Sequence, residues 1–279
     1  MLRGPQAPPA YSWFHYEEIN MPAILSQVEG FVGTITLNHP KKRNALSEHL
    51  VDGIIAALED FKARNVRVVI LRAPPGSGVW SAGHNVEELP EARRDPLGWD
   101  DPLRNLIRQI ENFPGPVIAM IEGTVWGGAC ETAFACDLIV AAPTTTFAVT
   151  PAKLGVPYNV SGMMTFLNAA SLRIVKELAF TARPLSAERA ERLGIINHVV
   201  PADALEAFTY DLAEDIAALA PLSIAVMKEQ LRILAGARPM SPQGFERVQG
   251  LRRVVYDSED YQEGIRAFKE KRKPQFKGN

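Results

Sequence analysis

Two short, nearly unbroken apolar runs enclose a glycine pair and a helix-forming segment in the middle of this 279-residue chain. The first run, PVIAMI, ends at Ile121, and the second, DLIVAA, begins at Asp137. Runs of this kind are typical of strands that are buried on both faces. Gly127 and Gly128 allow a sharp turn between them, and the following ACETAFA favours a helix. The stretch therefore predicts a strand, a tight corner and the start of a helix.

A corner of this kind can bind an oxygen that gains negative charge. The first N–H groups of a helix have no partner within it and lie at the positive end of its dipole. Glu131 stands about one turn inside the predicted helix, so its carboxyl group should lie near the same pocket. Paired glycines before a helix also occur at ordinary turns and close packing contacts, so this stretch alone leaves a structural interpretation open.

A second corner of the same type stands earlier in the chain. The run VVILR at 68–72 predicts another buried strand, which the loop APPGSGVW joins to SAGHN at 81–85. We expect a helix to start directly afterwards, at Val86 to Leu89. The chain thus has two predicted strand-to-helix corners, and each contains glycine.

With these corners the sequence resembles the crotonase, or enoyl-CoA hydratase/isomerase, superfamily. The superfamily's motifs stand here as SAGHN, as WGGACE at 126–131, and as a basic residue followed by Asn-Ala-Leu in KRNAL at 42–46. Its C-terminal pattern stands as SEDYQEG at 258–264, followed by FKEKRKPQF. The resemblance covers about residues 23–276 and implies an α/β fold, with a ββα spiral core followed by a C-terminal helical trimerisation region.

The expected organisation has three parts. Residues 1–22, rich in proline and aromatic residues, form a loose extension or a strap; residues 23–199 form the spiral core, and residues 200–279 the helical C-terminal region. A hairpin is predicted around Gly30, and strand signals stop at about Val160. Predicted helix starts lie at Ser47, Ser186, Asp203 and Ser241, and one helix carries the buried stripe Leu50, Ile54, Leu58 and Phe61.

Composition limits the classes of partner. The chain is 47% hydrophobic and 22% charged, as in ordinary globular proteins, and its formal net charge of −2 argues against general nucleic-acid binding. Cys130 and Cys136 lack the paired spacing of a zinc site and indicate buried thiols in a reducing compartment. No apolar run reaches the roughly 18 residues of a membrane span, so we expect a cytoplasmic protein without membrane contact.

The resemblance implies that the backbone amides of His84 and Gly128 stabilise the enolate oxygen of a CoA thioester. Removing one such donor typically costs about 10²–10³ in rate. The side chain of His84 is a separate question, because a histidine at a loop corner is more often packed or solvated than catalytic. We therefore assign the role to its amide.

The residues around Pro151 distinguish among crotonase reactions. Hydratases of the superfamily use two glutamates, and the first corresponds to Glu131. The second falls at Pro151, which cannot transfer a proton, so hydration by paired carboxylates is disfavoured. Thr150 and Tyr158 stand nearby instead.

Together with SAGHN and WGGACE, the segments FAVTPAKLGVPYN at 147–159 and VYDSEDYQEG at 255–264 resemble the methylmalonyl-CoA decarboxylase branch of the superfamily, which carries a tyrosine at the position of Tyr158. Decarboxylation requires the leaving carboxylate to stand out of the thioester plane, and a neutral phenol can orient it without stabilising the ground-state anion. Glu131, or a water that it orders, is then the candidate acid that protonates the enolate. The competing interpretations are a packed tyrosine and a glutamate kept for structural hydrogen bonds.

The resemblance also implies the coenzyme A contacts, a homotrimer or dimer of trimers, and a C-terminal helix that reaches a neighbouring subunit's site. The sequence offers no metal-ligand cluster and no phosphate-binding loop, so we expect no cofactor and no metal. Two other classes remain open: another crotonase reaction, such as hydration, isomerisation or thioester hydrolysis, and a non-catalytic binding protein of the same fold. The expected substrate-binding residues are Ala45, Leu46, His84, Asn85, Val86, Glu87, Glu88, Gly128, Thr150 and Lys271, the last of which would otherwise be a solvated charge.

Overall fold

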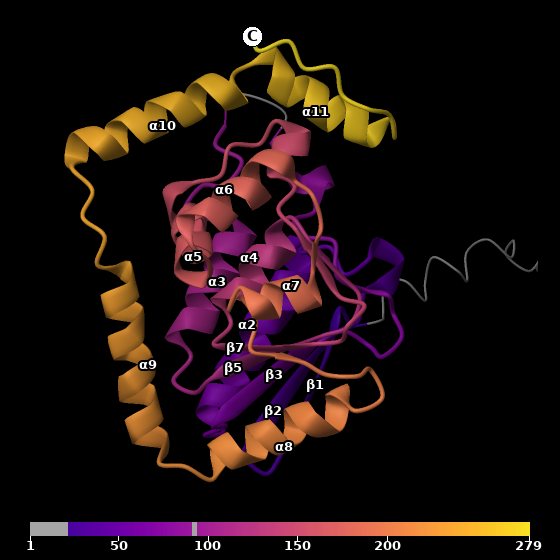
Figure 1. The fold of residues 1–279 in the computed structure, drawn as a ribbon, viewed down its shortest axis with the longest axis vertical. Helices are drawn as coiled ribbons and strands as arrows, with labels where there is room; N and C mark the ends of the chain where they lie inside the picture. The colour runs from indigo at the N-terminus through magenta and orange to yellow at the C-terminus, as the bar shows by residue number, and fades with distance from the viewer. Residues whose placement is uncertain (1–21, 91–93) are drawn as a thin grey trace, which may run out of the picture.

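The β-strands form two sheets in the computed structural model, which describes residues 22–90 and 94–279 (Figure 1). The predicted N-terminal extension therefore lies almost wholly outside the described residues. The first sheet has the order β1 (Ile24–Glu29), β2 (Val32–Leu37), β3 (Val68–Arg72), β5 (Val117–Ile121), β7 (Leu138–Ala141) and β10 (His198–Val199). The second has the order β4 (Val79–Ser81), β6 (Thr124–Trp126), β8 (Thr146–Ala148) and β9 (Leu185–Ser186).

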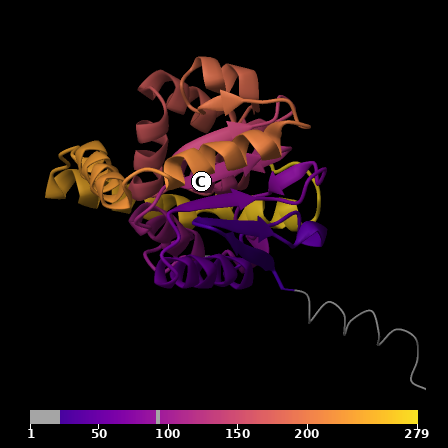
Figure 2. The ribbon, with the colours of Figure 1, turned by 90° about the horizontal axis from the view of Figure 1, so that it is seen from below.

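Helices cover both faces of the first sheet, which explains its apolar strands. Successive side chains of a strand point to opposite faces. Ile70 packs in the cluster that contains α8 (Leu205–Ala217), whereas Leu71 packs with α2 (Glu48–Ala63), α3 (Pro102–Asn112) and α4 (Gly128–Ala135). Seen from below, the strands lie between α8 on one side and α2 on the other (Figure 2).

The chain repeats one strand of each sheet and then a helix. This order occurs as β3, β4 and α3, then β5, β6 and α4, and again as β7 and β8 ahead of α5 (Val160–Ala169). Neighbouring turns pair in parallel, so each turn covers the apolar faces of the previous one. The predicted ββα spiral is confirmed.

Several local predictions are also confirmed. β1 and β2 form an antiparallel hairpin, and Gly30 has a φ of +56°, a left-handed value that glycine adopts easily. The Ser47 hydroxyl accepts from the Leu50 amide at 3.3 Å and begins α2. Ser186 and Ser241 cap α7 (Ala187–Arg192) and α10 (Pro242–Tyr256) in the same way.

Other local predictions are wrong in whole or in part. The helix predicted after SAGHN does begin at Val86, but it is only the short 3-10 helix η2 (Val86–Glu88), and the α-helix of this turn begins later, at Pro102. Asp203 does not cap α8, because Ala204 occupies the cap position and makes no side-chain bond there. Two short strands, β9 and β10, follow Val160, where strand signals were expected to have ended.

The helices of the C-terminal region differ in how they meet the core. In α8, Leu205 is buried and Leu212 and Ile216 pack against the sheet, whereas Phe208 is exposed. In contrast, α9 (Pro221–Gly236) lies apart from the core (Figure 1), and none of its residues, all of which are described, is buried. Its Lys228 side chain anchors it, donating at 3.0 Å to the carbonyl of Ile110 and pairing with Asp137 at 2.7 Å.

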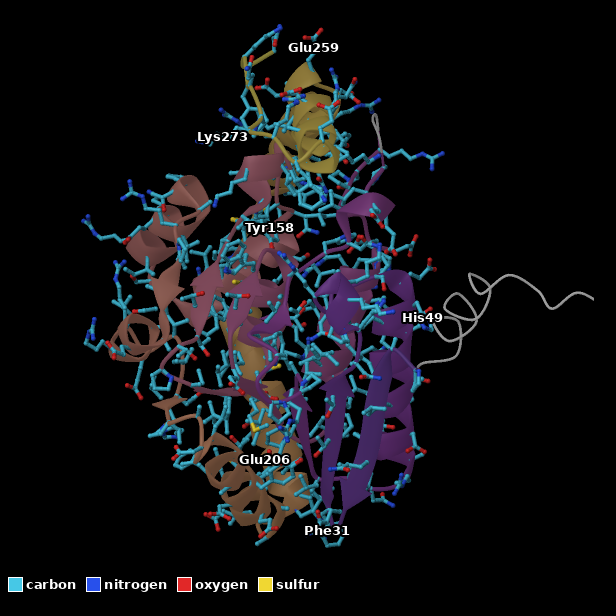
Figure 3. All side chains as sticks on the ribbon, turned by 90° about the vertical axis from the view of Figure 1, so that its right-hand side faces the viewer. Phe31, His49, Tyr158, Glu206, Glu259 and Lys273 are labelled. Carbon is cyan, nitrogen blue, oxygen red and sulfur yellow. The ribbon has the colours of Figure 1, made fainter. Side chains whose placement is uncertain are left out.

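The last helix, α11 (Glu259–Lys269), packs on its own chain. The Tyr261 hydroxyl donates to the carbonyl of Pro90 at 2.6 Å, and a Cβ on Gly264 would lie 2.2 Å from the carbonyl oxygen of Leu154. Tyr158 lies beneath this helix (Figure 3). That this helix also reaches the site of a neighbouring subunit remains a prediction. No helix in the described part of the chain is long and apolar enough to span a bilayer.

Candidate active site

The two glycine corners touch each other. Gly83 has a φ of +90° and Gly127 a φ of +58°, so both occupy the left-handed region that glycine tolerates. A Cβ placed on Gly83 would lie 2.7 Å from the Gly128 nitrogen, and one placed on Gly128 would lie 3.2 Å from the His84 nitrogen. The structure therefore brings together the two amides that the sequence predicted.

The loop that contains KRNAL holds the first corner. The Leu46 amide donates to Gly83 at 2.8 Å, and the Asn85 amide donates to Leu46 at 3.4 Å. Buried Asn44 donates through Nδ2 to the carbonyl of Trp80 at 3.0 Å. Since these bonds flank His84, its amide stays free: within the described residues neither it nor the Gly128 amide has a backbone acceptor.

The side chain of His84 has a structural partner. Its Nε2 lies 2.7 Å from Oδ2 of Asp101, whose other oxygen caps α3 by accepting from the amides of Leu103 and Arg104. Burial lowers the pKa of His84, but the hydrogen bond and charge of Asp101, with smaller contributions from Asn85 and Glu88, together raise the pKa overall. The imidazole is thus largely buried and hydrogen-bonded, and the ring links the first corner to α3.

Glu131 lies in α4, about one turn after Gly128, and is fully buried. Arg104 reaches it from α3, and its Nη2 donates to Oε1 of the carboxylate. Burial raises the pKa of Glu131 to about 7, although the charge and the hydrogen bond of Arg104 lower it. The second oxygen, Oε2, has no hydrogen-bond partner among the described residues. Glu131 therefore has both a structural bond and a free oxygen.

Tyr158 lies beside Glu131 because Gly162 leaves room for both. A Cβ on Gly162, in the first turn of α5, would lie 2.9 Å from Cε1 of Tyr158 and 3.0 Å from Oε1 of Glu131. The ring also meets Phe166 edge to face, with centroids 5.3 Å apart. Burial, and then the charge of Glu131, raise the pKa of Tyr158 well above its ordinary value. The phenol is therefore neutral, and its hydroxyl makes no hydrogen bond with the described residues.

Thr150 stands at the junction of the second corner and η3 (Pro151–Leu154). Its Oγ1 would lie 3.1 Å from a Cβ on Gly127, so the hydroxyl is beside the glycine pair. Pro151 is the first residue of η3, where it needs no amide hydrogen. The structure thus places Thr150 beside the second corner, and its contact with substrate remains a prediction.

The predicted coenzyme A segment has mixed roles. Leu46 is buried and forms a β-bridge with His84, whereas Ala45 and Val86 are half-buried. Glu88 accepts from the first amide of α2 at 3.0 Å, and Glu87 pairs with Lys42 at 3.1 Å in the exposed region. Lys271 is exposed just beyond α11. A contact of these residues with coenzyme A remains a prediction.

Three residues of the site were missed in the sequence. Asp101 and Arg104 belong to α3, whose start was not predicted, although Asp-Pro at 101–102 is a recognised helix-start pattern. Arg104 gave no signal, because a charge on an amphipathic helix normally faces water. Gly162 gave no signal in the sequence either, because only the fold shows that its missing side chain leaves room for Tyr158 beside Glu131.

A ββα spiral with two glycine corners that present neighbouring amides defines the crotonase class of folds. The sequence profile of the enoyl-CoA hydratase/isomerase family matches residues 27–279, so the chain belongs to that family.

Three relatives are close in sequence or structure. The methylmalonyl-CoA decarboxylase of Escherichia coli strain K12 is 54% identical over 248 residues, which cover 89% of this chain and 95% of that protein. A structure of methylmalonyl-CoA decarboxylase with 2-nitronate-propionyl-CoA has a TM-score of 0.91 at 52% identity, and covers 92% of this chain and 99% of its own. The complex of that enzyme with 2S-carboxypropyl-CoA also has a TM-score of 0.91, at 51% identity and 93% and 100% coverage.

Proposed function

We propose that this protein is a methylmalonyl-CoA decarboxylase, which converts methylmalonyl-CoA into propionyl-CoA and carbon dioxide. The central observation is the neutral phenol of Tyr158, whose ring lies beside Glu131 in the first turn of the helix that begins at Gly128. The identity of 54% to a methylmalonyl-CoA decarboxylase along 89% of the chain supports the same substrate.

The first step breaks the bond between C2 and the carboxylate. Tyr158 donates to the carboxylate and keeps it out of the thioester plane, so that the breaking bond overlaps the carbonyl π system. The electron pair moves into the thioester, and its oxygen becomes an enolate held by the amides of His84 and Gly128. Because Tyr158 is neutral, it does not stabilise the ground-state anion as lysine or arginine would.

The second step adds a proton to C2. Glu131, the carboxyl group of α4, lies beside Tyr158. Its pKa of about 7 leaves part of it protonated at neutral pH. Its oxygen Oε2, free of partners among the described residues, is our candidate donor, directly or through an ordered water. The neutral acid is regenerated from solvent after each turnover.

The setting of the reaction is part of the proposal. It needs no added metal, biotin or nucleotide, because amides, a phenol and a carboxyl group supply each step. We place the enzyme in the cytoplasm, where the buried thiols of Cys130 and Cys136 stay reduced. A homotrimer or dimer of trimers would cover the exposed apolar side chains of α9, among them Leu222, Leu231 and Leu234.

One experiment tests the proposal directly. Purified protein is incubated separately with methylmalonyl-CoA and with crotonyl-CoA, and both are followed by mass spectrometry. We expect methylmalonyl-CoA to lose the mass of carbon dioxide without any added cofactor. If crotonyl-CoA instead gains the mass of water while methylmalonyl-CoA is untouched, the protein is a hydratase and the proposal is wrong.

A further inference from the structure

We propose that Arg104 is a specificity-determining residue, whose charge compensates Glu131 and so allows an acyl group with its own carboxylate to bind. The inference rests on the proposed function, because it concerns the anionic group of methylmalonyl-CoA. Arg104 belongs to α3, which lies between the two corners in the sequence.

The Arg104 and Glu131 pair is buried. Their side chains are 6% and 0% exposed, and one guanidinium nitrogen donates to one carboxylate oxygen. In such a pocket charges interact strongly, because little water is present to screen them. The net charge of the pair therefore changes the binding free energy of any charged ligand group beside it.

The substrate carboxylate is expected to lie close to this pair. In the proposed mechanism it binds the Tyr158 hydroxyl. A Cβ on Gly162 would lie 2.6 Å from Cδ1 of the Tyr158 ring and 3.0 Å from Oε1 of Glu131, so the ring and the carboxylate are neighbours. Two carboxylates in one buried site repel each other, and one then takes up a proton or leaves. An ionised Glu131 without a cation would exclude the substrate anion in this way.

The other titratable groups that face Glu131 do not supply the missing cation. Asp101 and Glu111, both from the α3 segment, are acids, and Asp101 is bonded to His84. Burial raises the pKa values of Cys130 and Tyr158, which keeps both neutral. Arg104 supplies positive charge in direct contact with the carboxylate. Glu131 and Arg104 together thus have a net charge of zero when Glu131 is ionised.

The test compares an anionic ligand with a neutral one in four forms of the enzyme. These are the wild type, Arg104→Gln, Glu131→Gln and the double variant. The KM for methylmalonyl-CoA and the inhibition constant of propionyl-CoA are measured for each between about pH 7 and pH 9. Their ratio reports the preference for the carboxylate and cancels general damage to thioester binding.

Charge compensation predicts opposite shifts for the two single variants. Glu131→Gln leaves an uncompensated cation and should increase the preference for methylmalonyl-CoA by about tenfold or more. Arg104→Gln should decrease it, increasingly so as the pH rises and Glu131 ionises. The double variant has neither charge and should return within about threefold of the wild type.

Three results would overturn the inference. One is a shift of both single variants in the same direction, and another is equal weakening of both ligands by Arg104→Gln. The third is a double variant that stays about tenfold below the wild type, which would mean that Arg104 binds the substrate carboxylate directly. If Arg104→Gln does not fold, the inference is tested with the Glu131→Gln and double variants alone, because neither has an unpaired buried carboxylate. A wild type that never decarboxylates methylmalonyl-CoA refutes the proposed function instead.

Discussion

The Gly128→Pro substitution removes one hydrogen-bond donor from the site and adds the same Cβ that an alanine would add. Gly128 is the first residue of α4, a position where proline is well tolerated because its missing N–H has no partner within the helix. The amide that is lost is the one that lies beside His84 and is expected to bind the enolate oxygen. The substitution thus separates the role of this donor from the stability of the helix.

Gly128→Ala is the matched control, since it adds a Cβ and keeps the N–H. The new Cβ would lie 2.8 Å from Cδ2 of Leu103 and 3.2 Å from the nitrogen of His84. The first contact is with the end of a flexible side chain, which can shift, and the second is tight without being prohibitive. We expect the alanine variant to lose less than about tenfold in kcat, since the donor count is unchanged.

The proline variant should lose about 10²–10³ in kcat, or about 3–4 kcal/mol of transition-state stabilisation, as expected for one oxyanion donor. The assay follows the conversion of methylmalonyl-CoA by mass spectrometry, and circular dichroism checks that both variants are folded. A folded proline variant with the same kcat as the alanine variant would show that the Gly128 amide does not bind the enolate.

Further predictions address the other groups of the site. Tyr158→Phe should lower kcat by about 10²-fold with little change in thioester binding, because the hydroxyl acts on orientation; an unchanged kcat would exclude that role. In the wild type kcat should fall as the pH rises through about 7, where the neutral form of Glu131 is lost, and Glu131→Gln should abolish that limb of the profile. Lys271→Ala should raise the KM for methylmalonyl-CoA but affect its 3′-dephospho form far less; equal effects would exclude a phosphate contact. Replacing Leu231 by glutamate on exposed α9 should shift light scattering toward monomers, and a scattering mass that is monomeric already in the wild type would contradict the trimer.

The parts of the fold that local chemistry determines were predictable from the sequence. The apolar runs at 68–72 and 117–121 are strands because helices cover both of their faces, and Ser47 begins a helix because its hydroxyl caps it. The two corners were predictable for a similar reason, since glycine is needed wherever φ is positive and backbones meet closely. Gly83 satisfies both conditions, and Gly127 satisfies the first.

The parts that depend on distant contacts were not predictable. Whether the apolar stripe of α8 faces the sheet or another subunit depends on what covers it, and both surfaces give the same pattern. The same holds for Arg104, which looks like a solvent-facing charge until α4 places Glu131 against it. The packing of α11 on its own chain depends on Tyr261 and Gly264. Their partners, Pro90 and Leu154, lie more than a hundred residues earlier in the sequence.

The structure also explains how one scaffold can serve both hydration and decarboxylation. Both reactions pass through a thioester enolate, so the amides of His84 and Gly128 are useful in either case. The chemistry then depends on what surrounds C2: hydration needs a second carboxylate to activate water, and Pro151 removes it. A neutral phenol at Tyr158 and a compensated Glu131 favour instead a substrate that brings its own carboxylate and loses it as carbon dioxide. Restoring a glutamate at Pro151 should therefore not be enough to recover hydration, because the phenol of Tyr158 would still occupy the side of the pocket next to Glu131.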